Sequence, residues 1–278
     1  MPSLLTGKFE KPFSVFSGPH LRAPNSIYKI IWGSFLALLP ILVSNTIFFG
    51  WNAFRIFIIA TSSALLFEYL FQVIFRRKIQ IKNGHTLFLS ALLAFLIPST
   101  VSSEVVVIGS FVTVLIGKEI FGGLGQNLFH PTLVGCAALL ALFPTEMTEY
   151  VQTPFLTTIL AIIVSGTILF FKKWISWESS LIYLTTLTGS VFLLGGSPIE
   201  AIWSPYVFIC AFFFVTDSGT TPITKQGRAL FAVGTGILTA ILHLWAGPLK
   251  AVTTSVLFMN ALVPLIDRFV QPRLRKLR

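Results

Sequence analysis

Ten runs of apolar residues occupy most of the chain and leave only short connections between them. They lie near residues 28–49, 52–75, 86–98, 105–121, 131–144, 155–171, 181–195, 204–216, 228–246 and 251–270. Only 11% of the residues are charged, against roughly 25% in a soluble domain. Because backbone groups in lipid must be satisfied within their own segment, each run is expected to be a helix. The sequence therefore predicts an all-α integral membrane protein with ten transmembrane helices.

The basic residues are distributed unevenly over the connections. All but two of the 20 Lys and Arg residues fall on the side of the N-terminus, and the exceptions are Arg55 and Lys250. The positive-inside rule then makes both termini cytoplasmic and places residues 145–154 and 197–203 outside the membrane. The net charge of +10 is thereby explained by orientation, and we expect no nucleic-acid partner. We predict a multi-pass protein of the bacterial cytoplasmic (inner) membrane.

The predicted organisation is one transmembrane domain, residues 27–271, with two flanking segments. Residues 1–26 are polar and Pro-rich, without the apolar core of a signal peptide, and residues 272–278 form a basic cytoplasmic tail. Five helices followed by five give two halves of opposite orientation, about 27–150 and 151–271.

The third helix of each half, 86–98 and 204–216, is short. Thirteen residues span roughly 20 Å, well under a bilayer core of ~30 Å. Short helices at matching positions indicate an inverted repeat with a site near the repeat interface. Ordinary variation in helix length is the alternative.

One connection has an unusual composition, "GGLGQNLFHP" at residues 122–131. It contains three glycines, Gly122, Gly123 and Gly125. Glycine allows a positive φ and the close approach of a flat ligand. Asn127 and His130 offer hydrogen-bonding groups, and Pro131 suits the first turn of a helix whose dipole would face the site. These features suit a planar heteroaromatic ligand, but they also suit a simple turn between two helices.

A second polar stretch follows the eighth helix. Asp217, Thr220 and Thr221 either cap the next turn or belong to an ion or cofactor site. Within the second helix, Glu68 is a functional candidate, since carboxylates inside membranes are costly. Arg76 or Arg77 could neutralise it.

Three further features are interpreted structurally. Lys118 and Glu119 could form a local pair. Cys136 and Cys210 are single thiols inside apolar runs and are expected to be small core residues. The sequence offers no catalytic triad, metal cluster or nucleotide-binding loop, so we assign no catalytic or metal-ligating residue.

Four stretches resemble a family of membrane subunits of bacterial electron-transport complexes. This family comprises the D subunit of Rnf complexes and the B subunit of the sodium-translocating NADH:quinone oxidoreductase. The stretches are "GGLGQNLFHPTLVG" (122–135) with "ALFPTEM" (141–147), "NGHTLFLSALLAFLIPS" (83–99), "FFFVTDSGTTPITKQGR" (212–228) and "LVPLIDRFVQPR" (262–273). They occur in the family's order over about residues 20–273. The resemblance implies ten helices, with flavins that carry electrons and with further subunits as partners.

The family's flavin sites are only partly present. Its covalent FMN is attached to the Thr of an S-G-A-T motif in a long outer loop, whereas this chain has only "TEMTEYVQTP" (145–154) there and no such motif. We therefore expect no covalent FMN. The resemblance also implies a non-covalent flavin, riboflavin or FMN, held by two Asn of G-x-N-x-x-N-P. Asn127 occupies the first position and His130 the second, where it either contacts the flavin or only caps the helix.

Two functions follow. The first is a redox subunit that relays electrons within a larger assembly, either with or without coupling to ion movement. The alternative is a transporter- or channel-like subunit that kept the fold without a redox cofactor.

Overall fold

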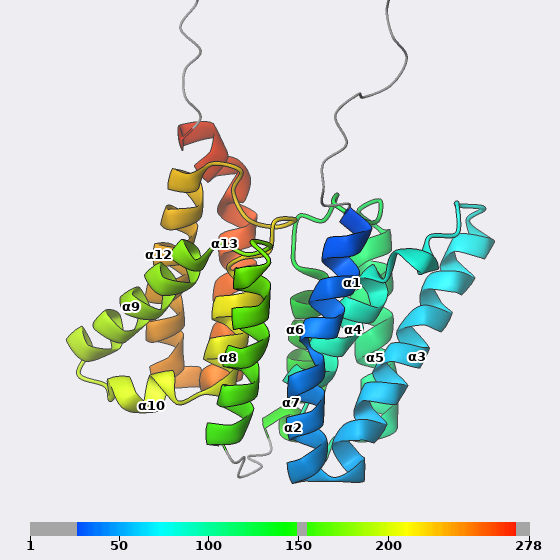
Figure 1. The fold of residues 1–278 in the computed structure, drawn as a ribbon, viewed down its shortest axis with the longest axis horizontal. Coiled ribbons are helices and arrows are strands. Elements are labelled where there is room, and N and C mark those ends of the chain that lie inside the picture. Colours follow the sequence, from blue (N-terminus) through cyan, green and yellow to red (C-terminus); the bar gives the residue numbers. More distant parts are fainter. Residues whose placement is uncertain (1–26, 149–154, 271–278) are drawn as a thin grey trace, which may run out of the picture.

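The computed structural model describes residues 27–148 and 155–270, and within these ranges the protein is built from helices without strands (Figure 1). In chain order the helices are α1 (Ile27–Ala37), α2 (Leu39–Phe49), α3 (Trp51–Ile74), η1 (Ile81–Asn83), α4 (His85–Leu96), α5 (Ser103–Phe111), η2 (Val112–Glu119), α6 (Pro131–Leu142), α7 (Pro144–Thr148), α8 (Phe155–Phe171), α9 (Trp177–Leu193), α10 (Pro198–Ile202), α11 (Pro205–Ile209), η3 (Cys210–Phe214), α12 (Lys225–Ala246) and α13 (Pro248–Val270). The predicted segments 1–26 and 272–278, and most of 145–154, lie outside the described residues.

Each of the ten predicted apolar segments contains helix. Four spans are long and apolar enough to cross a bilayer by themselves: Ile27–Phe49, which joins α1 and α2, and the helices α3, α12 and α13. Many large apolar side chains are exposed, among them Ile47, Leu193 and Trp245. A soluble protein rarely leaves so much contiguous apolar surface, whereas a bilayer covers it. The prediction of an all-α integral membrane protein is confirmed, and the number of membrane crossings stays a prediction.

The chain enters and leaves the described bundle at the same end, where α1 begins and α13 ends (Figure 1). We call this the terminal end and the opposite one the far end. The described Lys and Arg residues belong to the terminal end of their helices and connections, with two exceptions at the far end, Arg55 and Lys250. The charge asymmetry predicted from the sequence is thus a property of the folded bundle.

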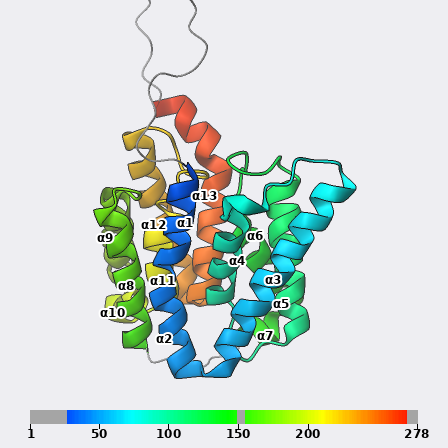
Figure 2. The same cartoon turned by 45° about the vertical axis from the view of Figure 1, so that its right-hand side comes forward.

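The two halves of the chain repeat one packing pattern. In the first half α3 packs on α4 and on α5–η2, α5–η2 packs on α6, and α1 contacts α4. In the second half α9 packs on η3 and on α12, α12 packs on α13, and α8 contacts α11. The halves meet through equivalent elements, α2 against α8 and α6 against α13 (Figure 1, Figure 2).

Small residues bring the central helices together. A Cβ atom at Gly117 of η2 would lie 2.7 Å from the Cα atom of Pro131, and one at Gly236 of α12 would lie 3.0 Å from the carbonyl of Tyr183 in α9. Such backbone-to-backbone approaches are typical of membrane helix pairs. The contact at Gly117 fixes the start of α6 against the end of η2, and it therefore fixes the glycine-containing turn that joins them.

Candidate functional site

Two π-helices, η2 and η3, lead to the same place between the halves, near the terminal end. We call this place the junction. It is formed by the turn 120–130, which follows η2, and by the loop 215–224, which follows η3. π-helical turns are rare and are frequently found at functional sites. Of the two short helices at matching positions, α4 is twelve residues long, and α11–η3 leads into the junction; that they mark a functional site stays a prediction.

The glycine turn has the backbone geometry expected from its sequence. The φ angles of Gly122, Gly123 and Gly125 are +110°, +97° and +80°. A Cβ atom at Gly123 or Gly125 would meet nothing within 4 Å, so the space beside these two residues is open. The glycines are required by backbone conformation, and the protein's own side chains do not fill the space beside the last two.

Pro131 begins α6 as predicted, and His130 occupies the N-cap position. Its side chain makes no capping hydrogen bond, and instead its ring lies edge-on to that of Phe214, with centroids 4.8 Å apart. His130 is buried, and its Nδ1 atom has no partner among the described residues. Burial lowers the pKa of His130, and the carboxylate of Asp217 opposes this shift. The ring contact with Phe214, three residues before Asp217, places the imidazole beside the loop that carries Asp217.

Asn260 of α13 joins the two parts of the junction. In the amide orientation that satisfies both neighbours, its nitrogen donates to the carbonyl of Thr220 (3.1 Å) and its oxygen accepts from the backbone N–H of His130 (3.0 Å). Sequence reasoning missed this residue, because a lone Asn in an apolar run shows no sign of its partners. Asn260 is completely buried, as expected for a residue that links two segments.

The loop residues form a turn of their own. Thr220 donates its hydroxyl to Asp217 Oδ2 (2.8 Å), and Thr221 donates to the Asp217 carbonyl (2.6 Å). Asp217 thus stabilises the turn, and its negative charge also acts on His130 by opposing the lowering of that residue's pKa. Asn127 on the facing turn has a buried Oδ1 atom without a partner among the described residues. The junction therefore offers two unsatisfied hydrogen-bonding atoms, Asn127 Oδ1 and His130 Nδ1.

Beside the junction, α3 and η2 enclose a network of buried charges. Lys118 Nζ lies 2.5 Å from Glu68 Oε1 and donates to Thr86 Oγ1 (2.7 Å). Gln72 Nε2 bridges the carboxylates of Glu68 (3.1 Å) and Glu119 (3.2 Å). We call Glu68, Gln72, Thr86, Lys118 and Glu119 the ion network.

One sequence interpretation needs correction here. Glu68 pairs with Lys118 and not with Arg76 or Arg77, because the side chains of α3 and η2 face each other across their packing contact. The expected local pair of Lys118 and Glu119 is confirmed, with the two groups 3.9 Å apart, and Glu119 is also contacted by Arg77 at 3.5 Å. The two cysteines are buried and free, as expected of core residues.

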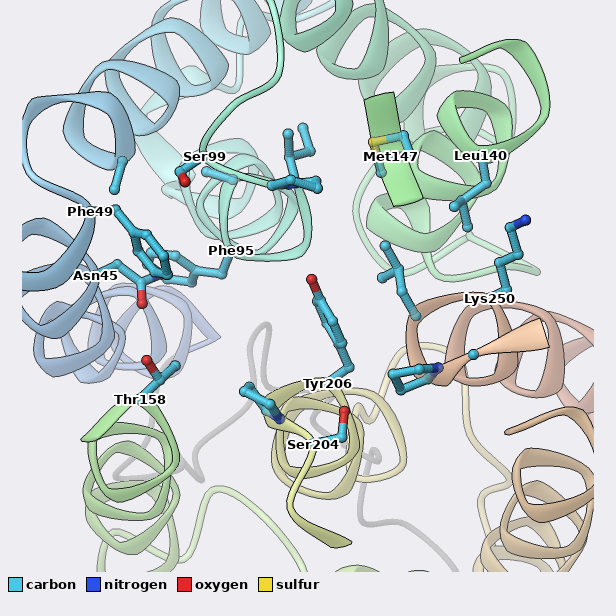
Figure 3. A pocket seen from close by; sticks show the side chains of 18 of the residues that line it. Asn45, Phe49, Phe95, Ser99, Leu140, Met147, Thr158, Ser204, Tyr206 and Lys250 are labelled. Atoms are coloured by element: carbon cyan, nitrogen blue, oxygen red, sulfur yellow. The ribbon is translucent and has the colours of Figure 1, made fainter. Parts of the chain in front are cut away.

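A cavity of about 740 Å³ opens between the halves at the far end (Figure 3). Its wall is largely apolar and aromatic and includes Phe49, Phe95 and Trp203. In Figure 3 the side chains of Asn45, Phe95, Thr158, Ser204 and Tyr206 surround one common space. Its size and lining are those of a small-molecule site.

Four polar atoms on this wall are buried and lack a partner among the described residues. They are Asn45 Oδ1, Thr158 Oγ1, Ser204 Oγ and His243 Nδ1. Buried polar groups are normally hydrogen-bonded, so these four atoms are available to the water or ligand that fills the cavity. Sequence reasoning missed this cavity, because its wall comes from helices and connections that are dispersed along both halves of the chain.

Comparison with known proteins agrees with the sequence resemblance. The model of the NQR2, RnfD, RnfE family matches residues 14–154 and 153–276. The D subunit of the proton-translocating ferredoxin:NAD(+) oxidoreductase complex of Clostridium ljungdahlii is 30% identical, with 94% of this chain and 95% of that protein aligned. The D subunit of the Na(+)-translocating complex of Acetobacterium woodii is 31% identical, with 95% and 96% aligned. Because the family model covers nearly the whole described bundle, the chain belongs to the NQR2, RnfD, RnfE family.

Proposed function

We propose that this chain is the membrane subunit of a multi-subunit, ion-translocating electron-transport complex. This proposal rests on the family membership of the chain and on its alignment, over nearly its whole length, with the D subunits of ferredoxin:NAD(+) oxidoreductase complexes. Its partners are the other subunits of that complex and the lipid bilayer. Since the relatives are named for different coupling ions, no ion is assigned to this chain.

We propose a topology of ten transmembrane helices in two inverted halves, in the cytoplasmic membrane and with both termini in the cytoplasm. The repeated packing pattern supports the repeat, since the main contacts described above for the first half have equivalents in the second. The gathering of Lys and Arg at the terminal end supports the orientation. The glycine turn and the ion network then lie near the cytoplasmic face.

A non-covalent flavin, riboflavin or FMN, is proposed at the junction. Asn127 and His130 would hold its polar edge, because each has a buried atom without a partner among the described residues. Gly122, Gly123 and Gly125 would let the backbone lie beside the ring, with Asp217, Thr220 and Thr221 on the facing loop. When bound, the flavin supplies one-electron and two-electron redox chemistry, which the side chains of this protein lack.

The far-end cavity is the second place where the geometry favours a planar ligand. It adjoins Met147, in the "FPTEM" stretch after which the resemblance described above implies a loop with covalent FMN. The alignment with the Clostridium protein runs over 314 positions against a chain of 278 residues, so that protein has residues that this chain lacks. A ligand in this cavity would therefore be held by the unpartnered polar atoms of the cavity wall and not by a covalent bond to an S-G-A-T threonine.

The test is the visible absorption spectrum of the purified protein and the flavin content of three variants. Asn127→Leu should release flavin from the junction, with a loss of roughly 1–3 kcal/mol or one to two decades in affinity. Folding should tolerate this change, because Asn127 Oδ1 has no partner among the described residues. Gly125→Val should bind still less, since a β-branched residue at φ +80° is strained. Asn52→Leu, which replaces an exposed amide at the start of α3, is the matched control.

Each result selects one interpretation. Flavin loss in Asn127→Leu but not in Asn52→Leu supports the junction. Retained flavin in Asn127→Leu together with loss in Asn45→Leu would move the cofactor to the far-end cavity. A purified wild-type complex in which this chain carries no flavin would favour the transporter-like alternative.

A further inference from the structure

The ion network contains one carboxylate oxygen that the fold leaves unused. Glu68 is completely buried, and its Oε1 atom accepts from both Lys118 and Gln72. Its Oε2 atom is buried and has no partner among the described residues. A buried carboxylate normally has both oxygens satisfied, so an unoccupied lone pair here needs an explanation.

The charges of the network are balanced as they stand. Glu68 is paired with Lys118, and Glu119 is paired with Arg77, whose side chain is 42% exposed. A new negative charge nearby would disturb this balance strongly, because electrostatic interactions are weakly screened inside a protein. A proton on Glu68 Oε2 would restore the balance without breaking any hydrogen bond of the network.

The network is attached directly to the proposed flavin site. The carbonyl of Lys118 accepts from the N–H of Gly123 (3.1 Å), and the carbonyl of Glu119 accepts from the N–H of Gly122 (3.2 Å). The residues that carry the buried charges therefore also hold two amides of the glycine turn.

The network meets the terminal-end surface at the partly exposed side chain of Arg77. The half-exposed guanidinium of Arg77 donates to the carbonyl of Glu119 and contacts its carboxylate. Lys118 Nζ lies between the carboxylates of Glu119 and Glu68, 3.9 Å and 2.5 Å away. A proton from the terminal-end solution can thus enter beside Arg77 and be passed inward through Glu119 and Lys118.

We propose that Glu68 is the proton-binding site that compensates the negative charge arriving when the flavin at the junction is reduced. This inference rests on the proposed flavin. In the step, one electron comes from a one-electron donor in a neighbouring subunit. One proton comes from the terminal-end solution and forms an O–H bond at Glu68 Oε2, and no other bond is broken. On reoxidation the electron leaves to an acceptor and the proton returns to solution.

Other titratable groups surround Glu68 and compete for the proton. Glu119 and Lys118 face it from η2, and Arg77 lies beyond Glu119. On α4, His85 lies within electrostatic range of both Lys118 and His130. Of these groups, Glu68 alone combines complete burial with an unoccupied carboxylate oxygen, and it is therefore the acceptor that we assign.

The test measures the midpoint potential of the bound flavin against pH, and the infrared difference spectrum between the reduced and oxidised protein. In the wild type the potential should fall by about 59 mV for each tenfold drop in proton concentration, the value for one proton per electron. Reduction should also produce the C=O stretch of a protonated carboxyl group. Glu68→Gln should flatten the slope and remove this band. Glu178→Gln, which replaces an exposed carboxylate at the start of α9, should change neither.

The outcomes separate this inference from the proposed function. Wild-type protein without flavin overturns the proposed function. If the Glu68→Gln variant binds flavin and still shows the wild-type dependence of midpoint potential on pH and the wild-type carboxyl band, the inference about Glu68 is wrong, whereas the proposed function stands. If Glu68→Gln does not fold, Glu68→Asp keeps the charge and should shift the frequency of the band. An unshifted band in Glu68→Asp would assign the proton to another group and refute the inference.

Discussion

Replacing Lys118 by Met should destabilise the protein strongly. The change removes the ammonium and keeps a side chain of similar length. Glu68 then retains a completely buried carboxylate that has lost its partner at 2.5 Å. Removing one member of a buried ion pair costs about 3–5 kcal/mol of unfolding free energy, because the remaining charge is uncompensated. In a chain of this size that corresponds to a fall on the order of 10 °C in the unfolding midpoint.

The two cysteines provide the assay. They are the only thiols in the sequence and both are buried, so a thiol-reactive dye reports unfolding without an added label. Lys172→Met, which removes an exposed Lys directly after the end of α8, is the matched control. It should change the unfolding free energy by no more than about 0.5 kcal/mol.

A double variant tests the cause of the effect. When Glu68→Gln is added to Lys118→Met, no uncompensated carboxylate remains in the pair, and most of the lost stability should return. The reasoning is refuted if Lys118→Met unfolds at the same temperature as Lys172→Met. It is also refuted if the double variant is as unstable as the two single losses added together.

Three further predictions concern packing, topology and the cofactor. Gly117→Ala should lower stability by about 1–3 kcal/mol, because its Cβ atom would lie 2.7 Å from Pro131; Gly189→Ala, in a helix with open space around it, should not, and equal unfolding midpoints would contradict this. In oriented membranes a thiol reagent added outside should label Ile199→Cys and not Gln80→Cys, and the reverse pattern would refute the proposed orientation. A denaturing gel viewed under ultraviolet light should show no fluorescent band at 30.7 kDa, whereas such a band would demonstrate a covalent flavin.

The helices could be predicted because their signal is local. A run of apolar residues must satisfy its own backbone in lipid, so its position in the sequence is also its position in the structure. The turn at residues 122–125 was predictable for the same reason, since a positive φ is a requirement of the glycines themselves. The start of α6 at Pro131 likewise depends on residues next to one another.

The partners of polar residues could not be predicted, because they depend on which helices meet. Glu68 and Lys118 are separated by 50 positions in the sequence, and nearby Arg76 and Arg77 were more obvious partners for Glu68. Asn260 lies far from both segments that it joins. Asn45 was inconspicuous in the sequence, yet it lines the far-end cavity with an unsatisfied oxygen. Tertiary packing creates these sites, and the single sequence contains no local pattern for them.

The junction and the far-end cavity lie at opposite ends of the interface between the halves. The helices between these two sites differ from both in carrying few charged side chains. Within the described residues, α2, α6, α8 and η3 carry no Asp, Glu, Lys, Arg or His. His85 stands at the start of α4, and α13 has Lys250 near its start and Asp267 and Arg268 near its end, with no such residue between them. Electrons can pass through such an apolar medium between planar ligands, whereas ions and protons need polar groups or water. We infer that this subunit carries electrons across its interface and that the ions move elsewhere in the complex. The chain alone in lipid vesicles is therefore expected to conduct no ions, and a conductance abolished by Glu68→Gln would show that the path runs through this bundle.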